Sequence, residues 1–288
     1  MNNSVLKKNI AIIGLTFVVI MFIIKAIAFK YSGSVSVLAS LIDSGADFFT
    51  TIITAIAVFT SSKPADKNHR FGHGKAESVG ALLQSIFIFI SAGFLIWRAI
   101  ANLIHGHPIH VDMITFSIMV ASLLLTVILV IAQRSVIRKT KSVAIKADNV
   151  NYTGDILTTS GVILSLAITK YLGIHNMDAI FGILIAFFLC YNAKKLLKES
   201  IDVLMDKEIN KTMKNKVKKE IRNHPGVLGY HNFRSRFCGQ TYFIEVHIEL
   251  NEDLRLKEAH EISHLLKEKI KSLHDNMDVT IHQDIHWK

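Results

Sequence analysis

Two pairs of polar residues with the same spacing stand inside long apolar stretches of this sequence. Asp43 and Asp47 form one pair, and Asn151 and Asp155 form the other. On a helix, residues four apart lie on one face, about one turn from each other. Each carboxylate at bilayer depth costs roughly 2.5–3.5 kcal/mol on insertion scales, and no lysine or arginine lies close to these residues in either stretch. Three carboxylates and one amide oxygen suit a divalent cation, so the pattern predicts a cation site between the two stretches.

A polar loop after the first of these stretches carries a second set of possible metal ligands. Asp66, His69 and His73 lie close together in the sequence. One carboxylate and two imidazoles can form a three-ligand, zinc-like site with one open position. A solvated loop with incidental histidines explains the same spacing equally well. In another loop, the histidine-rich segment His105–His110 is better explained as solvated than as a metal collector.

Histidines and acids alternate with apolar residues on two strands that we predict near the end of the chain. His247 lies on the polar face of the first strand, and His282 and Asp284 lie on the polar face of the second. His260 belongs to the helix between these strands. Polar residues on an exposed strand face are usually only solvated. Their repetition on two strands nevertheless favours metal binding.

The composition places these residues in a membrane protein. The chain has 288 residues, of which 50% are hydrophobic, and its formal net charge is +10. Most basic residues of the first two thirds flank apolar runs, which indicates membrane topology rather than nucleic-acid binding. Cys190 lies in an apolar run and Cys238 in the polar tail, so no disulfide framework is predicted.

Six apolar runs are long enough to be membrane helices. Lysine and arginine gather before the first run, at 63–75 and at 134–146, all on one side of the membrane, so the positive-inside rule predicts that both termini are cytoplasmic. Lys25, inside the first run, either reaches an interface or pairs with an acid. The predicted helices are Ile10–Phe29, Ser34–Thr60, Val79–Ile104, Met113–Ala132, Ala144–Leu172 and Met177–Leu197.

From about Lys207 the composition becomes that of a soluble domain. We therefore predict a six-helix transmembrane domain at 1–206 and a cytoplasmic domain at 207–288. An αββαβ order indicates a small two-layer α+β fold, close to the lower size limit for folding alone, so dimerisation or metal would help it. The predicted elements are a helix at Lys207–Asn223, strands at His231–Phe237 and Thr241–Leu250, a helix at Lys257–Leu273 and a strand at Met277–His286.

With these features the chain resembles the cation diffusion facilitator family, which consists of dimeric metal-cation/proton antiporters. The resemblance is carried by the two intramembrane polar pairs, by the stretch Phe71–Ser78 and by the ending Ile281–Asp284, and it covers nearly the whole length. It is strongest for the bacterial ferrous-iron and zinc efflux branch. It implies a ferredoxin-like or metallochaperone-like cytoplasmic domain and an integral protein of the bacterial inner membrane that is not an enzyme.

The resemblance also implies functional roles for particular residues. It implies divalent metal ions as cargo and as regulators, protons as the counter-ion, and a homodimer surrounded by lipid. It assigns a transport site to Asp43, Asp47, Asn151 and Asp155, a loop site to Asp66, His69 and His73, a binuclear cytoplasmic site to His231, His247, His260, His282 and Asp284, and a charge contact between protomers to Lys75 and Asp206.

One departure from the family pattern bears on the choice of metal. Zinc transporters of the family usually have histidine where this chain has Asn151. Asparagine offers an oxygen and cannot titrate, which raises the expectation of Mn²⁺ or Fe²⁺ beside Zn²⁺.

Two other classes of protein remain as alternatives. A metal-gated channel or receptor is compatible with the pattern. An intramembrane aspartyl protease also needs two aspartates on facing helices, but its Gly-x-Gly-Asp signature would require glycine where Tyr152 stands.

Overall fold

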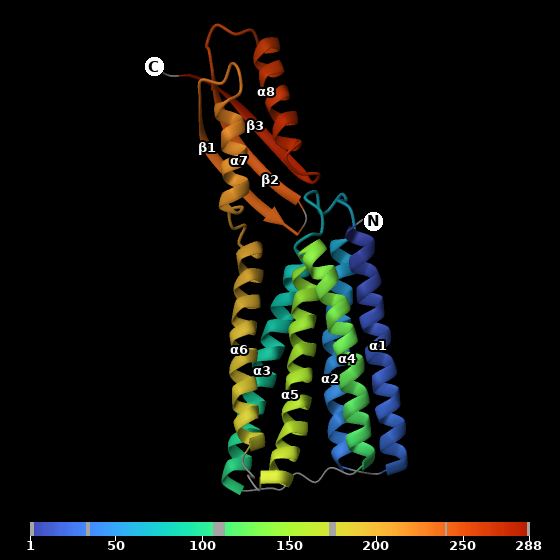
Figure 1. Ribbon diagram of the computed structural model, residues 1–288. Helices are drawn as coiled ribbons and strands as arrows, with labels where there is room; N and C mark the ends of the chain where they lie inside the picture. Colours follow the sequence, from blue (N-terminus) through green and yellow to red (C-terminus); the bar gives the residue numbers. More distant parts are fainter. Residues whose placement is uncertain (1–2, 33–34, 106–112, 173–176, 240, 287–288) are drawn as a thin grey trace. The chain divides into compact units, whose positions relative to one another are not determined.

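Six long helices form the first part of the chain in this computed structural model (Figure 1). The structure describes all residues except 1–2, 33–34, 106–112, 173–176, 240 and 287–288. The chain divides into two units, Met1–Ile201 and Asp202–Lys288. The six helices are α1 (Asn3–Ser32), α2 (Val35–Ser61), α3 (Ala76–His105), α4 (Met113–Thr140), α5 (Val143–Leu172) and α6 (Met177–Leu204).

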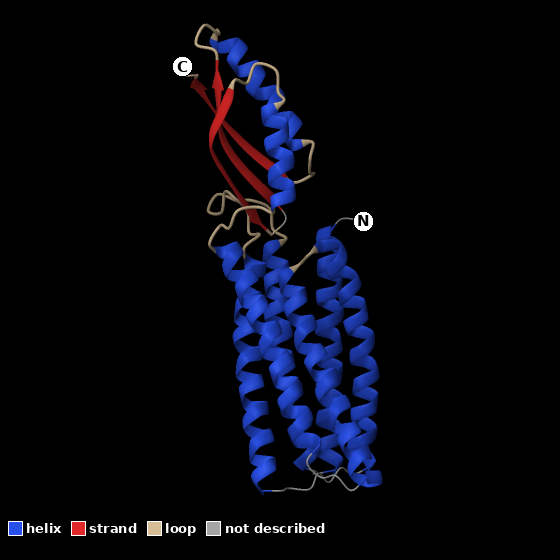
Figure 2. Ribbon diagram, turned by 60° about the vertical axis from the view of Figure 1, so that its left-hand side comes forward, coloured by secondary structure: helices blue, strands red, loops and turns tan. Residues whose placement is uncertain are grey.

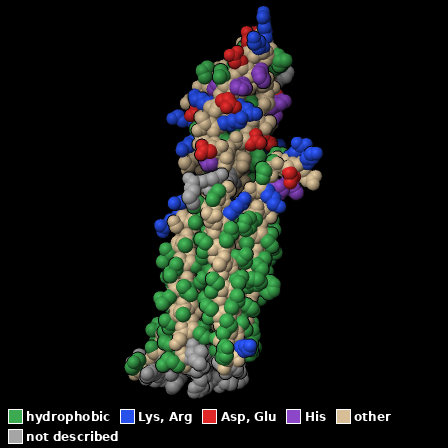
Figure 3. All heavy atoms as spheres, turned by 90° about the vertical axis from the view of Figure 1, so that its right-hand side faces the viewer, with side chains coloured by type: hydrophobic (Ala, Val, Ile, Leu, Met, Phe, Trp, Pro, Cys, Tyr) green, Lys and Arg blue, Asp and Glu red, His purple; other side chains and the backbone are tan. Residues whose placement is uncertain are grey.

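Within the described residues, five of these helices, α1 to α4 and α6, are long and apolar enough to cross a membrane. The sixth predicted span, α5, has a similar length but is not among these five. The α-helical membrane fold is thus confirmed, whereas the sixth span stays a prediction. Several helices extend beyond the predicted apolar runs, since the backbone stays helical in the polar flanks. Hydrophobic side chains cover the visible face of the bundle (Figure 3).

Small residues let the helices pack closely. The core shared by α3, α5 and α6 contains Ala81, Ala147, Ala186 and Ala193. A Cβ atom on Gly154 of α5 would lie 2.7 Å from a methyl group of Leu189 on α6. Because close approach depends on such residues, the alanines and this glycine hold α5 among its neighbours.

A buried ion pair joins the helices at the end of the bundle that carries the 62–75 loop. Lys7 Nζ of α1 lies 2.6 Å from Glu77 Oε1 of α3, and both side chains are almost fully buried. The same carboxylate accepts hydrogen bonds from Ser61 Oγ of α2 at 3.0 Å and from Ser142 Oγ, just before α5, at 2.5 Å. We call these four residues the Glu77 cluster. It ties α1, α2, α3 and the start of α5 together.

The second unit has the predicted αββαβ order (Figure 2). β1 pairs antiparallel with β2, and β2 pairs parallel with β3. Ile244, Val246 and Ile248 of β2 are buried in one core with the apolar faces of both helices, as their alternation predicts. The elements are α7 (Lys211–Arg222), β1 (Gly229–Cys238), β2 (Thr241–Leu250), α8 (Leu256–Lys271) and β3 (Met277–Ile285).

Candidate metal-binding sites

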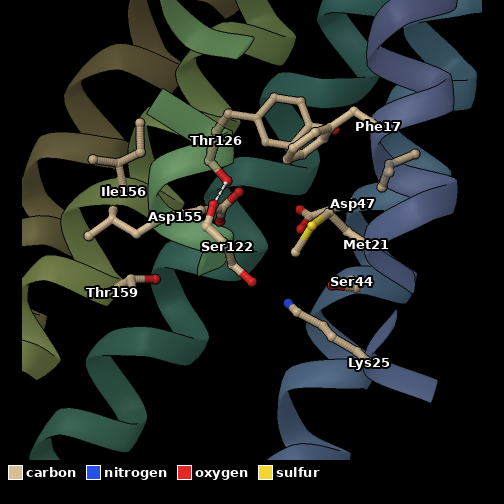
Figure 4. A pocket seen from close by; sticks show the side chains of 13 residues that line it. Phe17, Met21, Lys25, Ser44, Asp47, Ser122, Thr126, Asp155, Ile156 and Thr159 are labelled. Atoms are coloured by element: carbon tan, nitrogen blue, oxygen red, sulfur yellow. Dashed lines mark hydrogen bonds between the residues drawn. The ribbon is translucent and has the colours of Figure 1, made fainter. Parts of the chain in front are cut away.

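A cavity of about 60 Å³ between α1, α2, α4 and α5 is lined by Asp47 and Asp155 (Figure 4). Asn151 Nδ2 donates a hydrogen bond to Asp47 Oδ1 at 3.0 Å. The Oδ2 atom of Asp155 is buried and has no hydrogen-bond partner among the described residues. Helices α2 and α5 therefore bring three of the four predicted intramembrane residues together.

The fourth of these residues, Asp43, does not line the cavity. Its side chain is exposed on the surface of the single chain, one turn from Asp47 along α2. The carboxylates of Asp43, Asp47 and Asp155 do not converge on one point, since the groups of three acidic or histidine ligands found within 4.8 Å in the described chain lie elsewhere. Asp43 lies about 6 Å further along the α2 axis than Asp47, and of the two only Asp47 lines the cavity.

Lys25 of α1 brings a positive charge to the same cavity. Its side chain lines the cavity with Asp47 and Asp155, and its Nζ donates to the main-chain oxygen of Ser40 on α2 at 3.2 Å. Lys25 therefore points into the bundle instead of reaching for a membrane interface. This neighbour was not evident from the two polar pairs, because the lysine comes from a third helix.

Tyr152 of α5 lines the cavity together with Phe17 of α1. Its ring makes an edge contact with Phe17 of α1 at a centroid distance of 5.9 Å. Its hydroxyl lies 2.7 Å from Thr51 Oγ1 of α2. The ring is almost fully buried. These contacts join α1, α2 and α5 beside the cavity.

Thr51 also connects Tyr152 to a buried polar network around Asp148. Asp148 of α5 accepts hydrogen bonds from Gln133 Nε2 of α4 at 2.7 Å and from Thr51 Oγ1 at 3.4 Å. Asn149 donates to Gln133 Oε1 at 3.1 Å. Asp148 was not among the predicted site residues, although its place two turns before Asp155 on the same helix was a usable signal.

The loop ligands Asp66, His69 and His73 do come together. Asp66 Oδ1 lies 3.4 Å from His69 Nδ1, and Asp66 Oδ2 lies 3.3 Å from His73 Nε2. The backbone N–H groups of His69 and Asn68 donate to Asp66 and lower the pKa of its carboxyl below the ordinary value. His73 Nδ1 lies 3.2 Å from the Pro64 carbonyl, which leaves Nε2 toward Asp66. Such a contact orients an imidazole ligand before a metal arrives.

Four of the five predicted cytoplasmic ligands meet on the polar face of the sheet. Asp284 lies at the centre, with Oδ2 2.8 Å from His247 Nδ1 and 3.1 Å from His231 Nε2. Its Oδ1 atom lies 3.1 Å from His282 Nε2. The hydrogen bond from His247 is the main cause that lowers the pKa of Asp284. The strand register explains the convergence, because His247 pairs with His231 on one side and with His282 on the other.

His260, the fifth predicted ligand, does not join this cluster within one chain. It lies on α8, whose apolar side packs against the core face of the sheet. The other four ligands are on the opposite face, so the sheet itself separates them from His260. Two side chains that were not predicted as ligands border the cluster instead, since Glu249 lies 3.0 Å from His231 and 2.6 Å from His286.

The predicted contact between protomers involves one residue from each unit. Lys75 precedes α3 in the first unit, whereas Asp206 follows α6 and lies 3.3 Å from Arg236 in the second unit. Their pairing between two copies stays a prediction. The side chains of the segment 105–110 lie outside the described part of the chain.

Comparison with protein families accounts for both units. Residues 11–205 match the cation efflux transmembrane domain, and residues 209–286 match the cytoplasmic domain of cation efflux proteins. The chain belongs to the cation diffusion facilitator family. Members of this family are transporters and not enzymes, which excludes the aspartyl protease alternative. This cation diffusion facilitator is therefore an integral membrane protein for divalent-metal efflux, from the iron and zinc efflux branch.

Two relatives match almost the entire chain. The cation-efflux pump FieF of Cronobacter sakazakii is 38% identical over 265 residues, which are 92% of this chain and 88% of the relative. FieF of Salmonella arizonae is 36% identical over 279 residues, 97% of this chain and 93% of the relative. Among solved structures, the metal-bound C-terminal domain of the CzcD transporter from Thermotoga maritima is 30% identical and covers 27% of this chain and 94% of that domain, with a TM-score of 0.25.

Proposed function

We propose that this chain exports divalent transition-metal cations from the cytoplasm across the bacterial inner membrane, in exchange for protons and as a homodimer. The observation that carries the proposal is the cavity that holds Asp47 and Asp155, in which one carboxylate oxygen is buried without a partner among the residues that the structure describes. A buried, unpartnered carboxylate oxygen is costly, and a bound divalent cation supplies the missing interaction.

The transport ligands are Asp43, Asp47, Asn151 and Asp155. Because Asn151 now donates through its nitrogen to Asp47, its amide must turn so that the oxygen faces the ion. Asp43 must swing toward the cavity from one turn away. The ion thus gathers side chains that do not converge without it.

An all-oxygen ligand set favours Mn²⁺ or Fe²⁺ at least as much as Zn²⁺. Zinc sites commonly contain histidine nitrogen or cysteine sulfur, whereas carboxylate and carbonyl oxygens suit harder ions. We therefore expect the chain to transport Mn²⁺ or Fe²⁺ no less well than Zn²⁺.

Protons act as the counter-ion in this proposal. Carboxylates that lie close together repel one another once the ion leaves, so at least one of them takes up a proton. Asn151 cannot titrate, and exchange of metal for protons therefore depends on the three aspartates.

The other two clusters bind metal from the cytoplasm. Asp66, His69 and His73 hold one ion and leave a coordination position open. His231, His247, His282 and Asp284 hold regulatory metal on the polar face of the sheet, with His260 arriving from the second copy of the chain. Lys75 and Asp206 make the charge contact between protomers. The basic residues beside the apolar helices favour cytoplasmic termini.

Purified protein in sealed vesicles, with a metal-sensitive dye and a pH-sensitive dye, tests this function. We expect Asp47→Ala to abolish both metal flux and the proton movement that accompanies it, while leaving the protein folded. Asp178→Ala serves as a matched control, because Asp178 belongs to α6 and its carboxylate contacts Asn102 instead of the cavity.

Each outcome bears on a separate part of the proposal. Flux at the wild-type rate through Asp47→Ala would remove the assignment of the transport site. Metal movement through the native protein without proton movement would contradict antiport and favour a metal-gated channel.

A further inference from the structure

Ser122 of α4 carries a hydroxyl group that none of the sites described above uses. Its Oγ atom is buried and has no hydrogen-bond partner in the described part of the chain. Ser122 lines the same cavity as Asp47 and Asp155. In Figure 4 its side chain extends into the space beside Asp155 and toward Lys25.

Other serine and threonine hydroxyl groups in these helices donate a hydrogen bond to the main-chain oxygen four residues earlier. Thr126 Oγ1 donates to the main-chain oxygen of Ser122 at 2.7 Å, and Ser117 Oγ donates to that of Met113 at 2.9 Å. Ser85 makes the equivalent bond to Ala81 at 2.7 Å. This return to the carbonyl four residues earlier is the usual local solution in a helix. Ser122 does not adopt it.

A second buried oxygen that lacks a hydrogen-bond partner in the described chain lies at the same cavity as the Ser122 hydroxyl. Asp155 Oδ2 is also buried, has no partner within the described ranges, and belongs to a residue that lines the same cavity. Ser200 of α6 also has a buried hydroxyl for which the described residues supply no partner, but it does not line this cavity. Because buried polar atoms are normally satisfied, two such oxygens around one small cavity indicate a shared ligand.

We propose that the Ser122 hydroxyl is a further oxygen ligand of the transported ion, in addition to the carboxylate and amide groups of α2 and α5. The proposal rests on the proposed function, since it requires the ion to bind between Asp47 and Asp155. The hydroxyl belongs to α4, so the ion then bridges three helices instead of two.

Such a ligand selects among divalent metals. Zn²⁺ is satisfied by four ligands in a tetrahedron, which the aspartates and Asn151 already provide. Mn²⁺ in an oxygen environment takes octahedral coordination, so it gains from a fifth oxygen donor. Ser122 therefore supports the binding of Mn²⁺ and Fe²⁺ and contributes little to that of Zn²⁺.

The first experiment measures binding of Mn²⁺ and Zn²⁺ to the full-length protein in detergent by competition with a fluorescent chelator. Subtracting the binding that remains in Asp47→Ala isolates the transport site from the loop and cytoplasmic clusters. We expect Ser122→Ala to weaken Mn²⁺ binding by about tenfold, the scale on which loss of one supporting interaction changes metal affinity. Zn²⁺ binding should remain unchanged, and Ser117→Ala should alter neither metal.

The second experiment looks for a spectroscopic band that appears only if the side chain at position 122 binds the metal directly, and not if it only contributes to packing. Cysteine at position 122 has nearly the volume of serine and offers a thiolate, which binds soft metals directly. We expect Ser122→Cys to show a thiolate-to-cadmium charge-transfer band in the ultraviolet when Cd²⁺ is added. The native protein, which already contains Cys190 and Cys238, supplies the baseline, and Ser117→Cys is the control.

The outcomes separate this proposal from the proposed function. If Asp47→Ala removes site-specific binding but Ser122→Ala keeps the Mn²⁺ to Zn²⁺ ratio and Ser122→Cys shows no added band, Ser122 is not a ligand. Equal weakening of both metals by Ser122→Ala would also overturn the proposal, because the hydroxyl would then act on the fold or on Lys25. Unchanged binding in Asp47→Ala would instead refute the transport site itself.

Discussion

Replacing Lys7 with methionine should destabilise the helical bundle strongly, because it leaves a buried carboxylate without its counter-charge. The Lys7 and Glu77 side chains are 1% and 4% exposed, and Nζ lies 2.6 Å from Oε1. Methionine has a similar length and no charge. In the variant, Glu77 keeps only the hydroxyl groups of Ser61 and Ser142 as partners within the Glu77 cluster.

The size of the effect follows from this arrangement. Removing one member of a buried ion pair costs about 3–5 kcal/mol. The two hydroxyl groups still donate to the carboxylate, and hydrogen bonds to a charged group are worth about 1.5–3 kcal/mol each. We therefore expect a loss near the lower end, about 3 kcal/mol in the free energy of unfolding. The double variant Lys7→Met with Glu77→Gln buries no charge, so its loss should be clearly smaller than that of Lys7→Met alone.

Equilibrium unfolding in mixed detergent micelles measures these free energies for the native protein, both single variants and the double variant. Lys8→Met is the control, since the neighbouring lysine is less buried than Lys7. The double-mutant cycle then isolates the interaction between the two charges. A loss for Lys7→Met no greater than that for Lys8→Met, or a double variant as unstable as the single one, would refute this account of the Glu77 cluster.

Three further predictions concern metal choice and the cytoplasmic domain. Asn151→His should raise transport of Zn²⁺ relative to Mn²⁺ in competitive vesicle flux, because nitrogen replaces an oxygen donor. The prediction is contradicted if the native protein prefers Zn²⁺ and the Asn151→His variant transports the two metals in the same ratio. Asp284→Asn should abolish the rise in melting temperature of the cytoplasmic domain on adding metal, a stabilisation of about 2.7 kcal/mol at a metal concentration of 100 times Kd; a full rise in the variant would exclude Asp284 as a ligand. Hydrogen bonds from His286 and His231 lower the pKa of Glu249, so its contribution to stability is present above about pH 4.3 and is lost as the pH falls further. With chelator present, melting temperatures of the native protein should therefore fall more steeply in acid than those of Glu249→Gln, and parallel curves would count against this role.

The sequence by itself determined the elements and the faces of the strands. Apolar runs and alternation are local patterns, so they identify helices and buried strand positions without knowledge of the fold. For that reason His247 and Asp284 could be placed together on the polar face before their contact was seen. The two polar pairs likewise marked α2 and α5 as the helices that face each other.

Tertiary packing decided which side chains share the intramembrane cavity. A membrane helix is apolar on all sides, so its sequence does not reveal which face meets which neighbour. Lys25 and Ser122 reach the cavity from α1 and α4, and Asp43 lies outside it, because of how the helices pack. His260 is likewise separated from its predicted partners by the sheet. These relations join residues far apart in the chain, and such contacts depend on packing between elements rather than on the spacing within any one of them.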